Sequence, residues 1–134
     1  MPRFICAMPL RWSDMDSNGH VNSGAYSTYV EETRIRMFSD LIPSDPQERL
    51  TKNFFVFEQT IQFRRPLVYR EKPVTVEAWT EDVGAARFVA CCEIRDADTV
   101  YASSRTLMAG FDSIANRVRR FQESEREVIA SFME

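Results

Sequence analysis

Apolar and polar residues recur with helical spacing from about Ser23 to Ser39. Positions three and four residues apart form one stripe, as expected for a helix that buries a single face. The stripe consists of Tyr26, Tyr29, Val30, Thr33 and Met37. Glu31, Arg34 and Arg36 fall away from it, so we expect these charged side chains to lie away from the buried face. The pattern predicts one long amphipathic helix.

Most of the remaining chain alternates with the period of two that is typical of strands. Residues 3–11 predict a short first strand, and residues 55–64 predict a second one, which Pro66 closes. In the second strand we expect Phe55, Phe57, Ile61 and Phe63 on one face, and Glu58, Thr60, Gln62 and Arg64 on the other. Three more strands are expected at residues 74–78, 88–94 and 100–111. The short turns between these three predict an antiparallel meander.

The predicted order is strand, loop, long helix and four strands, followed by a C-terminal helix at residues 122–133. A single long helix must bury its stripe against the face of the sheet, which indicates an α+β fold. The chain has 134 residues, of which 44% are hydrophobic. This is enough for one packed core, so we expect a single domain over residues 1–134.

Charge and cysteine content narrow the functional classes. The formal net charge of −3 offers no basic field for nucleic acid or for acidic membranes. Three Cys and a single His argue against a disulfide framework and against a zinc site. No stretch is apolar over the length of a membrane span, and residues 1–4 lack the core of a signal peptide. We therefore expect a soluble cytoplasmic protein without nucleic-acid or membrane partners.

The loop before the long helix concentrates the candidate chemistry. It holds two carboxylates, two Asn and the only His of the chain, as Asp14, Asp16, Asn18, His20 and Asn22. A carboxylate near the start of a helix, with amide N–H groups pointing outward, is suited to attack on a carbonyl group. Asp16 could instead be a turn-forming residue that bonds only its own backbone. We expect Asp14 to hold the loop, and Asn22 or Ser23 to cap the helix.

Two blocks of the sequence carry a family resemblance. The first comprises Arg11-Trp12-Ser13-Asp14-Met15-Asp16, Gly19-His20-Val21-Asn22, Tyr26, Tyr29, Glu31 and Arg34, and the second is Phe63-Arg64-Arg65-Pro66-Leu67. They resemble hotdog-fold thioesterases of the 4-hydroxybenzoyl-CoA thioesterase type, over nearly the whole chain. The resemblance implies an antiparallel sheet wrapped around one long central helix, with dimers that align two sheets edge to edge. It also implies hydrolysis of an acyl-CoA or acyl-carrier thioester without metal or cofactor, since coenzyme A is part of the substrate.

The resemblance also assigns catalytic roles. Asp16 matches the catalytic carboxylate, which would act as nucleophile or as general base. Ser23 matches the position whose backbone N–H polarises the thioester carbonyl. The triplet Asp16, Asn18 and His20 is similar to the set in plant acyl-carrier-protein thioesterases. Those enzymes place a Glu before the paired Arg, where this chain has Gln62. The departure leaves Asp16 as the single acid.

Substrate contacts are expected at several further positions. Tyr26 is one turn into the helix and can line an acyl pocket, and Gln62 is a further substrate candidate. Coenzyme A carries phosphates, for which cationic contacts are expected; the candidates are Arg64, Arg65, Arg87, Arg117, Arg119 and Arg120. Strand alternation puts Arg64 and Arg65 on opposite faces, so at most one should reach a given nucleotide. Cys91 and Cys92 read as packing residues on opposite faces of a strand.

The favoured function is therefore an acyl-CoA thioesterase. A sheet of this size leaves an edge and an open face that need covering, so we expect a homodimer or homotetramer with a site between subunits. Two alternatives stay open. One is a non-catalytic acyl-CoA-binding or regulatory hotdog protein, and the other is a hotdog dehydratase or hydratase.

Overall fold

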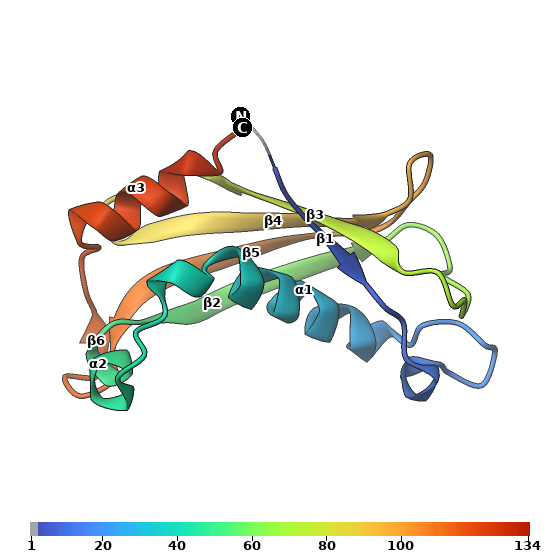
Figure 1. Cartoon of the computed structure of the whole chain (residues 1–134), viewed down its shortest axis with the longest axis horizontal. Helices are drawn as coiled ribbons and strands as arrows, with labels where there is room; N and C mark the ends of the chain where they lie inside the picture. Colours follow the sequence, from blue (N-terminus) through green and yellow to red (C-terminus); the bar gives the residue numbers. More distant parts are fainter. Residues whose placement is uncertain (1–2) are drawn as a thin grey trace.

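The computed structural model describes residues 3–134, which form a six-stranded antiparallel sheet around one long helix (Figure 1). The strands are β1 (Phe4–Met8), β2 (Asn53–Phe63), β3 (Val74–Glu81), β4 (Arg87–Arg95), β5 (Val100–Asp112) and β6 (Arg117–Val118). The helices are α1 (Ser23–Met37), α2 (Pro46–Thr51) and α3 (Glu123–Ser131), with short 3-10 helices η1 (Trp12–Asp14) and η2 (Ser39–Leu41). The strand order is β1-β3-β4-β5-β2, with β6 paired to β5, so β3, β4 and β5 form the expected meander.

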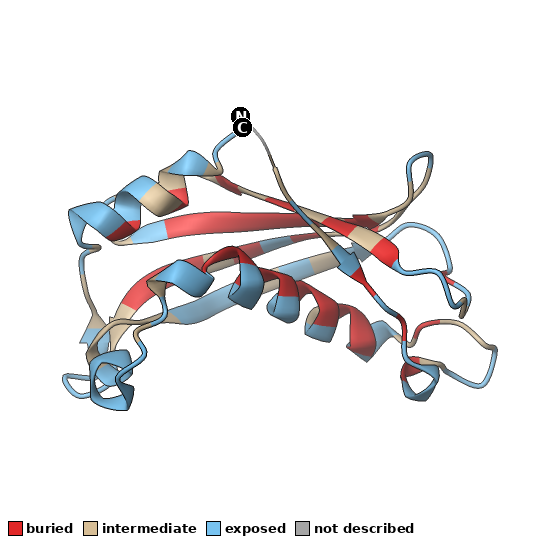
Figure 2. Cartoon of the chain, in the orientation of Figure 1, coloured by how far each residue is buried: buried red, intermediate tan, exposed pale blue. Residues whose placement is uncertain are grey.

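The core lies between α1 and the inner face of the sheet. Figure 2 shows buried positions along the side of α1 and along β3 and β4. The predicted α1 stripe is buried at every position, namely Tyr26, Tyr29, Val30, Thr33 and Met37. It packs with the alternate side chains of β3 and β4, which include Val76, Ala78, Phe88, Ala90, Cys92 and Ile94. The α+β class, with a sheet curled around one long helix, is confirmed.

The sequence pattern places Arg34 away from the buried face, and this prediction is wrong. Arg34 is only 7% exposed, and its guanidinium donates a hydrogen bond to Oε1 of Gln59 on β2 over 2.8 Å. The reason is the curl of the sheet, which covers α1 on its flank as well as on the side of the stripe (Figure 1). Glu31 and Arg36 are exposed, as expected.

Strand β2 also departs from its predicted pattern. A β-bulge shifts the register between Val56 and Glu58, so that the strand changes which side chains face the helix. Phe55 and Phe57 lie together on the outer face, 45% and 44% exposed, with ring centroids 5.0 Å apart. Phe54 packs inward against Phe38, and Ile61 and Phe63 also face inward. The four apolar residues expected on one face are therefore divided between two faces, because a bulge inverts simple alternation. Glu58, Thr60, Gln62 and Arg64 share the outer face, as predicted.

Strand β2 forms one edge of the sheet. It pairs with β5 along one side, and its other side has no strand partner within residues 3–134. Val56 and Phe63 on this edge strand are 39% and 55% exposed. An exposed edge with apolar side chains is a surface that natural proteins generally cover.

The connection from α1 to β2 contains the short helix α2, which the sequence pattern does not indicate. Asp45 caps it by accepting a hydrogen bond from the Gln47 backbone N–H over 3.0 Å, and Pro46 begins its first turn. Within the described residues, no helix is both long enough and apolar enough to cross a membrane.

Candidate active site

The buried side chain of Asp14 holds the polar loop before α1 in place. The Asp14 carboxylate is 7% exposed and accepts two hydrogen bonds from the Arg11 guanidinium, at 2.9 and 3.2 Å, and one from the Tyr29 phenol at 2.8 Å. The Arg11 guanidinium holds the pKa of Asp14 below its usual value. Burial and this contact with Asp14 raise the pKa of Tyr29, so its phenol stays protonated and donates. Asp14 holds the loop, as expected.

Asn22 joins the loop to the helix. Its side-chain Oδ1 accepts a hydrogen bond from the Ala25 backbone N–H at 3.0 Å, which caps α1. Its Nδ2 donates to the backbone carbonyl of Asp14 at 2.7 Å. One side chain therefore sets both the start of the helix and the path of the loop.

The Asp16 carboxylate is exposed at the tip of this loop. Its Oδ1 accepts hydrogen bonds from the backbone N–H groups of Asn18 and His20, at 2.8 and 3.1 Å. Gly19 completes the tight turn with a φ of +76°, a conformation in which glycine is favoured. The second oxygen, Oδ2, makes no hydrogen bond within residues 3–134. The turn therefore orients the carboxylate and leaves one oxygen free for chemistry.

The first turn of α1 lies beside this carboxylate. Ser23 is the first helical residue, so its backbone N–H has no acceptor inside the helix. It donates no hydrogen bond elsewhere in the described part of the chain. Such an N–H group, at the positive end of the helix dipole, can polarise a carbonyl oxygen.

A cleft of about 430 Å³ brings most of the predicted site residues together. It is lined by Asp16, His20, Val21, Ser23, Tyr26, Phe63, Arg64, Arg65 and Pro66. Tyr26 forms its inner wall, with its ring centroid 5.1 Å from that of Phe63. Burial raises the pKa of the Tyr26 phenol, so it is a neutral donor at physiological pH. The cleft thus combines a carboxylate, a free helix N–H and two cations.

Both Arg64 and Arg65 line this cleft, but the Arg64 guanidinium lies on the outer face of the sheet, where it donates to Oε1 of Gln62 at 2.9 Å and to Oγ of Ser103 at 3.2 Å. Although β2 ends at Phe63, Arg64 continues the outward row of Thr60 and Gln62, as strand alternation predicts. The backbone N–H groups of Arg64 and Arg65 both donate to the Tyr101 carbonyl, at 2.8 and 3.2 Å. The Arg64 guanidinium is therefore already engaged, whereas the Arg65 side chain makes no hydrogen bond or ion pair within residues 3–134.

Three other predicted site residues lie outside the cleft. Asn18 contributes only its backbone N–H to Asp16, and its side chain is exposed. Gln62 is on the outer face of the sheet, where its Oε1 accepts from Arg64 at 2.9 Å. Arg87 is also on the outer face, with its guanidinium carbon 5.3 Å from the centroid of the Phe57 ring. Strand position decides these three outcomes, because each residue belongs to an outward-facing row or a loop tip.

The remaining basic and cysteine candidates have structural surroundings. Arg119 is paired with the buried Glu125 carboxylate at 2.7 Å, so its charge is already engaged. Arg117 and Arg120 are exposed and do not line the cleft. Cys91 and Cys92 are both buried in β4, and burial raises the pKa of the Cys92 thiol to about 11. Within residues 3–134, no cluster of His, Cys, Asp and Glu is placed to hold a metal ion.

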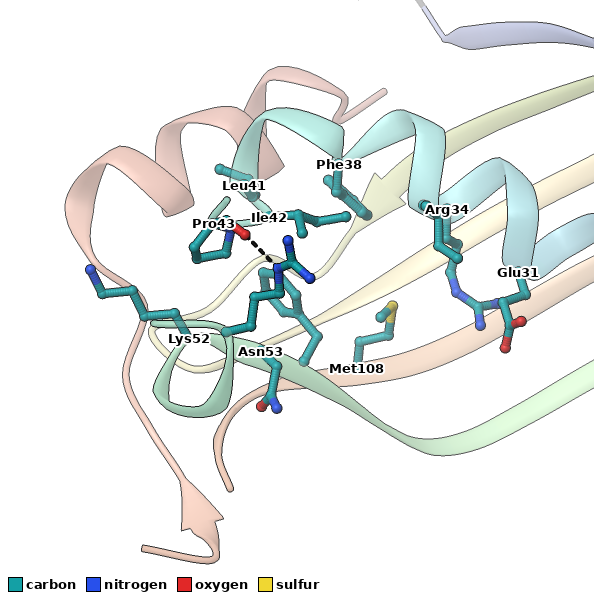
Figure 3. Close-up of a pocket in the computed structure, with 12 residues that line it drawn as sticks. Glu31, Arg34, Phe38, Leu41, Ile42, Pro43, Lys52, Asn53 and Met108 are labelled. Atoms are coloured by element: carbon teal, nitrogen blue, oxygen red, sulfur yellow. Dashed lines mark hydrogen bonds between the residues drawn. The ribbon is translucent and has the colours of Figure 1, made fainter. Parts of the chain in front are cut away.

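The sequence pattern misses a second cavity of about 290 Å³ near the other end of α1. It is largely apolar and is lined by Glu31, Arg34, Ile35, Phe38, Leu41, Ile42, Pro43, Arg49, Lys52, Asn53, Phe54 and Met108 (Figure 3). These residues come from α1, the α1–β2 connection, β2 and β5, so only the folded chain brings them together. The one local signal is the charged Arg34 beside a stripe of apolar positions. We call this cavity the apolar pocket.

The sequence profile of the thioesterase-like superfamily matches residues 10–129. No curated protein sequence matches the chain. A protein from Bacillus stearothermophilus, described as a predicted thioesterase, superposes with a TM-score of 0.88 at 20% identity, over 98% of this chain and 97% of its own. A Staphylococcus aureus protein in complex with CoA superposes with a TM-score of 0.86 at 20% identity, over 97% of this chain and 83% of its own. A Thermus thermophilus thioesterase complexed with coenzyme A and Zn superposes with a TM-score of 0.80 at 23% identity, over 96% of this chain and 92% of its own. These likenesses confirm the expected hotdog fold.

Proposed function

The chain belongs to the thioesterase-like superfamily, and from this premise we propose that it is an acyl-CoA thioesterase, which hydrolyses a thioester to a free acid and CoA. One observation carries the proposal. A carboxylate with a free oxygen, on Asp16, shares a cleft with the unpaired backbone N–H of Ser23 at the start of α1. That combination supplies an attacking or proton-accepting group together with a donor for the carbonyl oxygen.

The proposed reaction begins with the thioester carbonyl oxygen accepting a hydrogen bond from the Ser23 N–H. In one route Asp16 attacks the carbonyl carbon, the C–S bond breaks to release the CoA thiolate, and water then hydrolyses the mixed anhydride. In the other route Asp16 takes a proton from a water that attacks directly, and that proton passes to the leaving sulfur. Appearance of ¹⁸O in the Asp16 carboxylate after a single turnover in labelled water would identify the first route, since water reaches the Asp16 carbon only when it hydrolyses the mixed anhydride there.

Coenzyme A requires cationic contacts close to the cleft, because the net charge of −3 gives no long-range attraction. Arg65 at the cleft is the proposed phosphate contact, since the Arg64 guanidinium is engaged by Gln62 and Ser103. Two of the structurally similar proteins were solved with CoA, which supports this class of ligand.

We further propose that the active form is at least a homodimer joined through β2. Two copies of β2 paired antiparallel across a two-fold axis would set the end of one strand beside the start of the other. Phe63 at the end of β2 lines the Asp16 cleft, whereas Asn53 and Phe54 at its start line the apolar pocket. The pairing would therefore join the cleft of one subunit to the apolar pocket of its partner. The joined space would hold the reacting carbonyl at one end and the acyl chain at the other.

The test is a panel of acyl-CoA substrates of graded length and branching, with release of free thiol as the readout. The proposal expects saturable turnover of at least one of them. Coenzyme A binding without any turnover would favour a non-catalytic acyl-CoA-binding protein. That alternative has one observation behind it, since Asp16 Oδ1 is already occupied by backbone N–H groups in the manner of a turn-forming residue.

A further inference from the structure

Arg34 is a buried cation without a counter-ion. The residue lines the apolar pocket and is 7% exposed (Figure 3). No carboxylate within residues 3–134 lies within 4.0 Å of it to form an ion pair. Buried guanidinium groups normally pair with a carboxylate or phosphate, because an uncompensated charge in an apolar setting is unfavourable. Burial accordingly lowers the pKa of Arg34 below its usual value.

The hydrogen bonds of Arg34 leave one edge of the guanidinium free. Nη1 donates to Oε1 of Gln59 at 2.8 Å and lies 3.4 Å from Oγ1 of Thr106. Nε and Nη2 make no hydrogen bond to any described residue. These two nitrogens form the side of the guanidinium that binds both oxygens of a carboxylate at once. The unused donors are therefore those suited to a bidentate anion.

The other charged residues around the apolar pocket also favour an anionic ligand. Arg49 and Lys52 line it together with Arg34, against the single carboxylate of Glu31. Arg49 donates to the backbone carbonyls of Pro43 and Ser44, at 2.6 and 3.0 Å, rather than to an acid. None of these four side chains is in an ion pair within the described chain. The pocket therefore has a positive balance around apolar walls.

We propose that Arg34 binds a carboxylate at the far end of the acyl group, so that the substrates are thioesters of acyl chains that carry a second carboxylate. The inference rests on the proposed function and names its substrate class. Ile35, Phe38, Ile42, Phe54 and Met108 supply apolar contacts for the methylene groups of the chain. In the β2-paired dimer the apolar pocket adjoins the partner's cleft, so one acyl chain extends from the reacting carbonyl to Arg34. A neutral oxygen would not compensate the buried charge, and a carboxylate would.

The first experiment compares pairs of substrates that differ only at the far end. Each ω-carboxyacyl-CoA, from succinyl- to suberoyl-CoA, is measured against the monocarboxylic acyl-CoA of equal length. The readout is the ratio of their kcat/KM values in wild type, Arg34→Met and Arg36→Met. Arg36 is the matched control, since it is exposed on the same helix and pairs with Glu32 at 3.5 Å.

Wild type should prefer the ω-carboxy member of at least one pair. Arg34→Met should lower that preference by at least about tenfold, the size of a lost charge-assisted hydrogen bond, chiefly through KM. Arg36→Met should leave the preference as it is. A preference that is absent in wild type, or equal in all three proteins, would overturn the inference.

A second measurement detects binding of a carboxylate through the Tm and does not depend on catalytic turnover. Hexanoate, whose carboxylate and tail represent the far end of the acyl chain, should raise the Tm of wild type and of Asp16→Asn, whereas hexanamide should not. Arg34→Met should lose the hexanoate shift while Arg36→Met keeps it. Because Thr106 still donates to Gln59 at 3.0 Å, removing Arg34 leaves no unpaired acceptor and the variant should fold.

The two measurements separate the proposed thioesterase function from the proposed carboxylate site at Arg34. A hexanoate shift that depends on Arg34, without hydrolysis of any thioester, would contradict the proposed function and support the carboxylate site. Thioester hydrolysis without a hexanoate shift in wild type would support the proposed function and overturn the role of Arg34.

Discussion

The phenol of Tyr29 donates a hydrogen bond to the buried carboxylate of Asp14 over 2.8 Å. This contact ties the middle of α1 to the loop that carries Asp16, two residues further along the chain. The position of the candidate catalytic carboxylate is therefore set by the helix rather than by the loop alone. Stability and catalysis should be coupled through this one hydrogen bond.

Tyr29→Phe tests that coupling. The change leaves a buried carboxylate oxygen with one donor fewer, so the free energy of unfolding should fall by about 1–2 kcal/mol. Because the loop is loosened, kcat should fall as well, with KM less affected. Urea unfolding and steady-state kinetics measure the two effects. Tyr69→Phe is the matched control, because the Tyr69 phenol makes no hydrogen bond within residues 3–134.

The free energy of unfolding at acidic pH should depend on the ionisation of Asp14. Its pKa is lowered in the folded protein, mainly by the Arg11 guanidinium, so the unfolded chain takes up this proton more readily. The stabilisation is fully present above the unfolded pKa of about 4 and is lost as pH falls through the lower folded pKa. Asp14→Asn should thus be less stable than wild type at neutral pH, and the gap should narrow as pH falls below about 4. A gap of constant size across that range, in thermal melts, would contradict the assignment.

The phosphate contact should be made by Arg65, since it lines the cleft and the Arg64 guanidinium is engaged by Gln62 and Ser103 on the outer face. Arg65→Ala should raise KM for acyl-CoA by about tenfold, as expected for one charge-assisted contact, whereas Arg64→Ala should leave KM close to that of wild type. The effect should disappear on the matching acyl-pantetheine, which lacks the nucleotide phosphates. Arg87→Ala, on the outer face of the sheet, is the control and should leave both values unchanged. An equal loss on both substrates in Arg65→Ala would assign this arginine a structural role.

The proposed dimer can be tested at the free edge of β2. Val56→Lys places a charge on that edge, a substitution that natural sheets use to prevent pairing. In sedimentation experiments at micromolar concentration, wild type should be dimeric or larger, whereas the variant should dissociate and lose activity in parallel. Ile114→Lys changes another exposed apolar residue, in the β5–β6 turn, and should do neither. A wild-type monomer with full turnover would exclude a shared site.

Local periodicity accounts for the parts of the fold that the sequence predicts. The α1 stripe and the inward rows of β3 and β4 are correct, because each depends on side chains within one regular element. The β2 faces are wrong, since a single extra residue at the bulge inverts the alternation after Val56. The burial of Arg34 is also missed, because it depends on a sheet that curls around the helix and not on the helix itself.

The same distinction separates the site residues that the sequence predicts correctly from those that it does not. Asp16, His20, Ser23 and Tyr26 are close in sequence, and the structure places them in one cleft. Gln62 and Arg87 depend on which face of a strand they occupy, and they lie outside it. Most residues of the apolar pocket lie between Glu31 and Phe54, but they belong to a helix, a connection and a strand whose arrangement in space no local periodicity indicates, and Met108 comes from β5. Contacts between distant segments are what the sequence pattern leaves undetermined.

The most direct test of the account is the kcat of purified Asp16→Asn on the best acyl-CoA substrate of wild type. The substitution keeps the shape and the Oδ1 acceptor of the turn, and it removes the free carboxylate oxygen. We predict a fall in kcat of at least about 100-fold, with Tm and KM close to those of wild type. Unchanged turnover in folded Asp16→Asn protein would contradict a thioesterase mechanism centred on this carboxylate.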